Sequence, residues 1–107
     1  MQATEITQDA FVAAHASGAP VVDVRSPEEY AAGHVPGAVN IPLEQVAARR
    51  EEFASDSPMH VICQSGGRSM QASEALAATG VPALSVAGGT KGWIDAGRPV
   101  VTGSSPR

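Results

Sequence analysis

The sequence predicts one small α/β domain in which helices cover both faces of a parallel sheet. Segments that favour strands and helices alternate several times along the 107 residues. The expected strands are apolar throughout instead of alternating with polar residues, which is typical of strands buried on both faces. The length fits a single domain over residues 1–107, and we expect a core over about residues 5–101 and a flexible tail over residues 102–107.

The individual elements follow from apolar runs and from residues that begin or end helices. The expected strands are residues 21–25, 38–42, 59–63 and 83–89. The expected helices are residues 8–17, 27–32, 43–54, 69–79 and 90–97. Thr7 is the expected cap of the first helix, while Ser26 and Glu29 form a capping-box pattern with Pro27 at the first helical position. Ligands bind beyond the carboxyl ends of parallel strands, so a site is expected at that edge of the sheet.

Composition and charge exclude several classes of function. The net charge of −4 argues against a nucleic-acid partner and against an anionic membrane surface. No stretch approaches the roughly 20 apolar residues that span a bilayer, and the N-terminus lacks the pattern of a signal peptide. The single cysteine cannot form an intrachain disulfide and suits a reducing compartment, so we expect a cytoplasmic protein. Three isolated histidines lack metal-ligand spacing, and neither a metal nor a cofactor is expected.

The single cysteine, Cys63, stands where an expected strand ends. A thiol reacts as the thiolate, and its ordinary pKa leaves only a small fraction ionised at neutral pH. Three features favour the anion here: a helix that begins at about Ser69, a backbone that Gly66 and Gly67 allow to curl, and the cation Arg68. A buried, inert structural thiol is the alternative for a free cysteine. The glycine loop between strand and helix favours a nucleophile in an anion cradle.

Residues 61–69, with the sequence VICQSGGRS, resemble the active-site loop of the rhodanese family. Single-domain members of that family often show Cys-x-x-Gly-x-Arg, which here is Cys63, Gly66 and Arg68. Residues 21–42 and 86–100 resemble two further family segments. Their matching positions are Asp23, Arg25, Glu29, Tyr30, Gly33, His34, Gly37, Ala38, Asn40, Ile41 and Pro42, and then Gly88, Gly89, Trp93, Gly97, Pro99 and Val100.

The resemblance implies a three-layer rhodanese-like fold and a thiosulfate sulfurtransferase type of enzyme that forms a persulfide on Cys63. A small anionic donor, thiosulfate or a persulfide, would give up its outer sulfur, and cyanide or a thiol would then remove it. The residues expected to bind the donor are Gln64, Ser65, Gly66, Gly67, Arg68 and Ser69. With one cysteine in the chain, the persulfide cannot be resolved internally, so an outside acceptor is required. His34 is implied to be a structural residue.

Three residues beyond the loop are weaker candidates for the site. Asp23 and Arg25 lie two residues apart on one strand, and we expect a polar pair that fixes neighbouring loops at the carboxyl end of the sheet. Steering of anions by Arg25 is the alternative. Trp93 is expected in the core, although its turn could wall one side of the pocket. His60 precedes Cys63 by three positions, so strand alternation points it to the opposite face and makes it a poor base.

Two alternatives to this enzyme are considered. Related phosphatases and arsenate reductases have five residues between the cysteine and the arginine, whereas this chain has four, Gln64 to Gly67, which favours sulfur over phosphate. A sulfur-carrier or protein-interaction module is the second alternative, in which Cys63 passes sulfur to a protein partner. Turnover of thiosulfate with cyanide separates an enzyme from a carrier.

Overall fold

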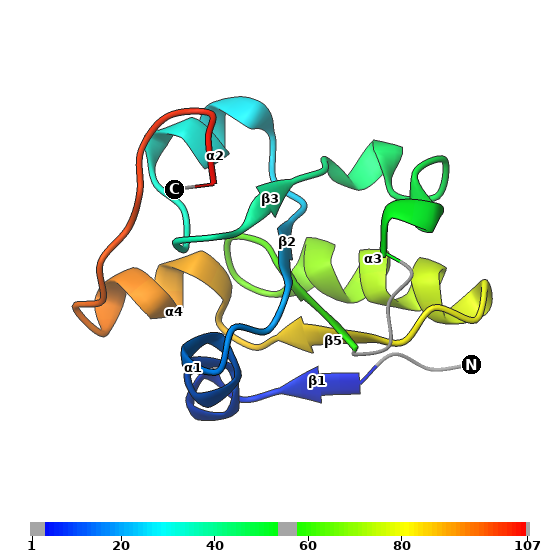
Figure 1. Cartoon of the computed structure of the whole chain (residues 1–107), viewed down its shortest axis with the longest axis horizontal. Coiled ribbons are helices and arrows are strands. Elements are labelled where there is room, and N and C mark those ends of the chain that lie inside the picture. Colours follow the sequence, from blue (N-terminus) through cyan, green and yellow to red (C-terminus); the bar gives the residue numbers. More distant parts are fainter. Residues whose placement is uncertain (1–3, 54–57, 107) are drawn as a thin grey trace.

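The computed structural model describes residues 4–53 and 58–106, and in this part of the chain the strands form one five-stranded sheet with helices on both faces (Figure 1). The strands are β1 (Thr4–Ile6), β2 (Val21–Asp23), β3 (Val39–Asn40), β4 (Met59–Ile62) and β5 (Ala83–Val86). The helices are α1 (Gln8–Ala16), α2 (Pro27–Ala32), α3 (Gly67–Ala78) and α4 (Gly89–Asp95). The strand order is β1-β5-β4-β2-β3, and every pairing is parallel. The predicted fold class is confirmed.

The sheet divides the core into two layers, which strand alternation along β4 makes clear. Val61 and Cys63 pack with Ala72 and Leu76 of α3 on one face. Ile62 lies on the other face, where the cluster brings together side chains of α1, α2 and α4. That second cluster consists of Phe11, Val21, Tyr30, Val35, Ala38, Ile62, Val86 and Trp93. Cys63 therefore lies on the α3 side of the sheet.

The predicted starts of α1 and α2 are confirmed in detail. The Thr7 side chain accepts a hydrogen bond from the backbone N–H of Ala10, which supplies one of the partners that a helix start lacks. The capping box of α2 is complete, because Ser26 accepts from the Glu29 backbone and Glu29 accepts from the Ser26 backbone. None of the described helices is long and apolar enough to cross a membrane.

The prediction of a regular helix over residues 43–54 is wrong for the part that the structure describes. This segment forms two short 3-10 helices, Leu43–Gln45 and Arg50–Phe53, joined by a turn. Of residues 43–52, only Val46 is fully buried, so no continuous apolar face holds a regular helix against the sheet. Residue 54 lies outside the described residues.

The described structure contains a strand near the N-terminus that was not predicted, and the C-terminal segment contacts α2. β1 was not predicted, because its three residues are mostly exposed, and it is held by backbone pairing along the edge of β5. In the segment predicted to be a flexible tail, two residues make backbone hydrogen bonds to the rest of the chain, and the flexibility itself stays a prediction. Gly103 N donates to Ala31 O, and Gly37 N donates to Pro106 O. The C-terminal segment therefore returns to α2, as Figure 1 shows. The glycine- and serine-rich composition of this segment does not predict these backbone hydrogen bonds.

Candidate active site

Cys63 follows β4 directly and lies at the carboxyl edge of the sheet. The residue is 1% exposed. α3 begins at Gly67, two residues before the predicted start at Ser69. Ser69 therefore lies in the first turn of the helix, next to the sulfur. Gly66 caps α3 with a φ of 119°, a conformation that favours glycine because residues with a Cβ are strained there. Four residues, Cys63 to Gly66, connect β4 to α3.

Hydrogen-bond donors converge on the sulfur of Cys63. The backbone N–H of Gly66 donates to Sγ over 3.1 Å, and Ser69 Oγ lies 3.5 Å from Sγ. Burial alone would raise the pKa of the Cys63 thiol. The Ser69 hydroxyl and the backbone N–H groups of Ser69, Gly66 and Ser65 outweigh burial, so the pKa falls below its ordinary value. The geometry agrees with the predicted anion cradle.

The residues that the sequence predicts for donor binding lie in the loop after Cys63 and in the first turn of α3. Gln64 is half-buried, whereas Ser65 and Gly67 are exposed. Gly66 and Ser69 are buried beneath them. The side chains between Cys63 and Arg68 are therefore small except for Gln64, and Cys63 itself is almost fully buried. This arrangement suits a nucleophile that reacts with a small group and is shielded from water.

Arg68 is held by a carboxylate that the sequence analysis assigned only to helix capping. Its Nη1 and Nη2 donate to Glu29 Oε1 and Oε2 over 2.7 and 2.9 Å, in a bidentate pair. These hydrogen bonds lower the pKa of Glu29 to about 2. The sequence did not predict this partner of Arg68, whose pKa is raised by the hydrogen bonds to Glu29 and further by a negative charge on Cys63. No sequence signal connects positions 29 and 68, which come from α2 and α3.

Asp23 and Arg25 form the predicted polar pair, and they also contact the loop. The pair is bidentate and deeply buried, with Arg25 4% and Asp23 0% exposed. Arg25 Nη2 donates to Gly33 O, and Arg25 Nη1 donates to Gln64 Oε1 over 3.2 Å. A guanidinium can only donate, so it fixes the orientation of the Gln64 amide with the oxygen toward Arg25. Burial prevents Arg25 from steering anions directly.

The first turn of α4 supports the Cys63 loop through backbone contacts. Thr90 N donates to Cys63 O over 2.8 Å, and a Cβ at Gly89 would lie 2.4 Å from that oxygen, so no side chain fits there. Gln8 fastens the same turn, since its Nε2 donates to Ala87 O and Gly89 O. Sequence reasoning missed Gln8, because nothing local distinguishes it from a surface glutamine.

Trp93 occupies the other side of the sheet from the sulfur. Its ring packs edge-on against Phe11 and His15, and its Nε1 donates to Pro99 O. It is 3% exposed. The indole is therefore part of the core, as first expected, and the turn that precedes it is what contacts the loop.

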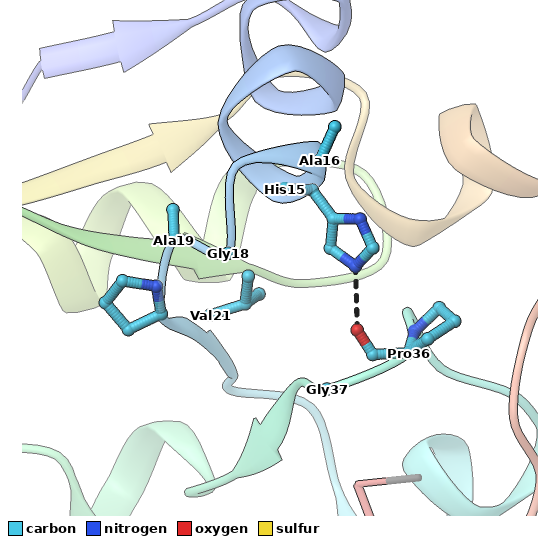
Figure 2. Close-up of a pocket in the computed structure, with 8 residues that line it drawn as sticks. His15, Ala16, Gly18, Ala19, Val21, Pro36 and Gly37 are labelled. Atoms are coloured by element: carbon cyan, nitrogen blue, oxygen red, sulfur yellow. Dashed lines mark hydrogen bonds between the residues drawn. The ribbon is translucent and has the colours of Figure 1, made fainter.

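A cavity of about 500 Å³ lies at the opposite end of the sheet, before β2 and β3 (Figure 2). It is lined by residues near Pro20 and Pro36, and His15 is its titratable group. His15 is half-buried, and its Nε2 lies 2.8 Å from Pro36 O. This cavity contains no nucleophile, so it is not where the chemistry of Cys63 occurs. Within residues 4–53 and 58–106, no three His, Cys, Asp or Glu side chains gather to hold a metal ion.

Comparisons with known proteins agree with this geometry. The sulfurtransferase of Allochromatium vinosum is 35% identical over 82 residues, which cover 76% of this chain and 77% of that protein. The thiosulfate sulfurtransferase GlpE of Pseudomonas entomophila is 36% identical over 89 residues, covering 82% of each chain. The crystal structure of a rhodanese-related protein from Thermoplasma volcanium superposes with a TM-score of 0.83 at 32% identity, covering 94% of this chain and 99% of that one.

The family model of the rhodanese-like domain matches residues 7–96. These residues include the whole loop around Cys63 and every strand except β1. The family match, the parallel sheet and the cysteine at the start of α3 lead to one conclusion. The chain belongs to the family of rhodanese-like domains.

Proposed function

We propose that this protein is a sulfurtransferase that acts through a persulfide on Cys63. The observation that carries the proposal is one buried thiol that is hydrogen-bonded to backbone N–H groups and to the Ser69 hydroxyl, which together lower its pKa. An activated thiolate at the floor of a small-walled loop is the nucleophile that sulfur transfer requires. The names of similar proteins, sulfurtransferase and thiosulfate sulfurtransferase, support the same reaction class.

The proposed reaction has two steps that balance without a cofactor. The Cys63 thiolate attacks the outer sulfur of thiosulfate or of a persulfide, a new Sγ–S bond forms, and sulfite or a thiolate leaves with the electron pair of the broken S–S bond. Cyanide or an acceptor thiolate then attacks the outer sulfur, and the electron pair of the Sγ–S bond returns to Cys63. The donors around Sγ stabilise the thiolate before the first step and after the second. Such an unpaired thiol suits a reducing compartment, and we propose a cytoplasmic location.

Intact mass after incubation with sulfur donors tests this proposal. Thiosulfate or glutathione persulfide should add the mass of one sulfur atom, and cyanide should remove it. The Cys63→Ser variant should gain nothing under the same conditions. If no donor produces the adduct on the folded protein, the enzyme proposal fails.

A sulfur carrier is the second candidate, and the pairing of Arg68 with Glu29 favours it. With its guanidinium held by a carboxylate, Arg68 offers less to the sulfonate of free thiosulfate. A protein donor could supply its own contacts instead. A carrier should accept sulfur on Cys63 and yet turn over thiosulfate and cyanide poorly until its partner protein is added, whereas an enzyme turns over without one.

A further inference from the structure

A second serine lies behind the donors that surround Cys63. Ser85 of β5 and Ser69 of α3 are both fully buried, and their Oγ atoms are 2.8 Å apart. Ser69 Oγ also lies 3.1 Å from Gly66 O and 3.5 Å from Cys63 Sγ. A chain of polar groups therefore runs from β5 through α3 to the sulfur.

The number of hydroxyl protons determines which of the two serines donates the hydrogen bond between them. Each serine has one hydroxyl proton, and the bond to Ser69 is the one that Ser85 Oγ makes among the described residues. If Ser69 donated to Ser85, the buried proton of Ser85 would have no acceptor, which is unfavourable. Ser85 therefore donates to Ser69, and the Ser69 proton remains for Gly66 O or for the sulfur.

The direction matters because the sulfur changes from donor to acceptor when it ionises. As a thiol, Cys63 donates its S–H to Ser69 Oγ, and Ser69 donates to Gly66 O. As a thiolate, Cys63 has no proton to give, and its charge makes it a stronger acceptor than a carbonyl oxygen. The Ser69 hydroxyl can then turn to Sγ while it still accepts from Ser85.

We propose that Ser85 is a positioning residue for the nucleophile: its hydroxyl donates to Ser69 Oγ and so directs and strengthens the Ser69 hydrogen bond to the Cys63 thiolate. The strengthening arises because a hydroxyl that accepts a hydrogen bond becomes a better donor. The consequence for catalysis rests on the proposed function. When cyanide attacks the outer sulfur of the persulfide, thiocyanate leaves and the Sγ–S electron pair returns to Cys63. The Ser69 hydroxyl then donates a hydrogen bond to the new thiolate.

The rate of alkylation by iodoacetamide as a function of pH tests the proposal without any sulfur donor. Cys63 is the single cysteine of the chain, so the midpoint of the profile is the pKa of its thiol. Ser85→Ala should raise this pKa by about 0.5 to 1 unit, the scale of one weakened hydrogen bond. Ser73→Ala is the matched control. Like Ser85, Ser73 is fully buried, but it lies on α3 and its Oγ has no hydrogen-bond partner among the described residues. Ser73→Ala should therefore leave the pKa of Cys63 unchanged.

A double-mutant cycle separates positioning from a general structural effect. Because Ser85 acts through Ser69, the Ser69→Ala/Ser85→Ala variant should have the same pKa as Ser69→Ala alone. An absent shift in Ser85→Ala, or an equal shift with and without Ser69, would overturn the proposal. Should Ser85→Ala fold poorly, Ser85→Thr keeps a hydroxyl and should retain the wild-type pKa, and a raised value there counts against the proposal. A protein that shows the predicted shifts but forms no persulfide would refute the proposed function and leave the role of Ser85 intact.

Discussion

Two arginines flank the Cys63 loop, each paired with a carboxylate, but their surroundings differ. The pair of Arg25 with Asp23 is 4% and 0% exposed, and Arg25 also donates to Gly33 O and Gln64 Oε1. The pair of Arg68 with Glu29 is 37% exposed on both sides. Taking charges out of water is costly unless they stay paired, so the buried pair must persist throughout the reaction cycle. The more exposed pair can open at smaller cost, and we propose that its arginine then becomes available to an anion.

The buried pair should therefore dominate stability. Asp23→Asn leaves the Arg25 guanidinium buried beside a neutral amide, and we expect the free energy of unfolding to fall by about 3–5 kcal/mol. Chemical denaturation measures this loss. Asp95→Asn is the matched control, since the same change removes the exposed Lys91–Asp95 pair, and it should alter stability little. Equal effects of the two substitutions would show that the buried pair has no special role.

The Arg68–Glu29 pair should instead affect how efficiently the protein uses the sulfur donor thiosulfate. Arg68→Ala removes the more exposed of the two cations beside the loop, and we expect kcat/KM for thiosulfate to fall about 10- to 100-fold, as for the loss of a hydrogen bond to a charged group. The stability of the fold should hardly change, because both partners are well solvated. Arg50→Ala, which removes the same charge from the 3-10 segment after β3, is the control. If both variants lose activity equally, Arg68 does not bind the donor.

The difference between the two pairs also indicates what sequence could predict. Asp23 and Arg25 are two residues apart on one strand, so their pairing follows from local geometry. The loop around Cys63 was predictable for the same reason, because a strand end, two glycines and a helix start are neighbours in the chain. Glu29, Gln8 and Ser85 reach the site from distant segments. Tertiary packing alone brings them there, and each has an ordinary local explanation.

The elements that were missed depend on similar long-range effects. β1 is three residues long and mostly exposed, so only its pairing with β5 makes it a strand. The helix expected over residues 43–54 has good spacing of apolar residues, yet among residues 43–52 only Val46 is fully buried against the sheet. Periodicity predicts which face could be buried, but the space left by neighbouring elements decides whether it is.

A smaller effect, on KM, distinguishes the two roles that Glu29 could have. Glu29→Gln keeps the oxygen that caps α2 but removes the charge that holds Arg68. If Glu29 competes with the donor, KM for thiosulfate should fall a few-fold, and if Glu29 holds Arg68 in a productive position, KM should rise. We expect the fall, because a carboxylate beside an anion site disfavours a second anion. Glu28→Gln, an exposed neighbour on the same helix, controls for net charge.

The pH dependence of stability independently measures how much the Glu29–Arg68 pair stabilises the fold. The pKa of Glu29 is lowered to about 2 in the folded protein, from an unfolded value near 4.3. A carboxylate with a lowered pKa stabilises the fold fully above the unfolded value, and this contribution is lost as the pH falls toward about 2. The difference in stability between wild type and Glu29→Gln should thus shrink between pH 5 and pH 2, by less than about 1 kcal/mol because the pair is 37% exposed. Chemical denaturation across this range measures it. A constant difference would mean that the pair contributes nothing in solution, and that Arg68 is already free to meet a donor.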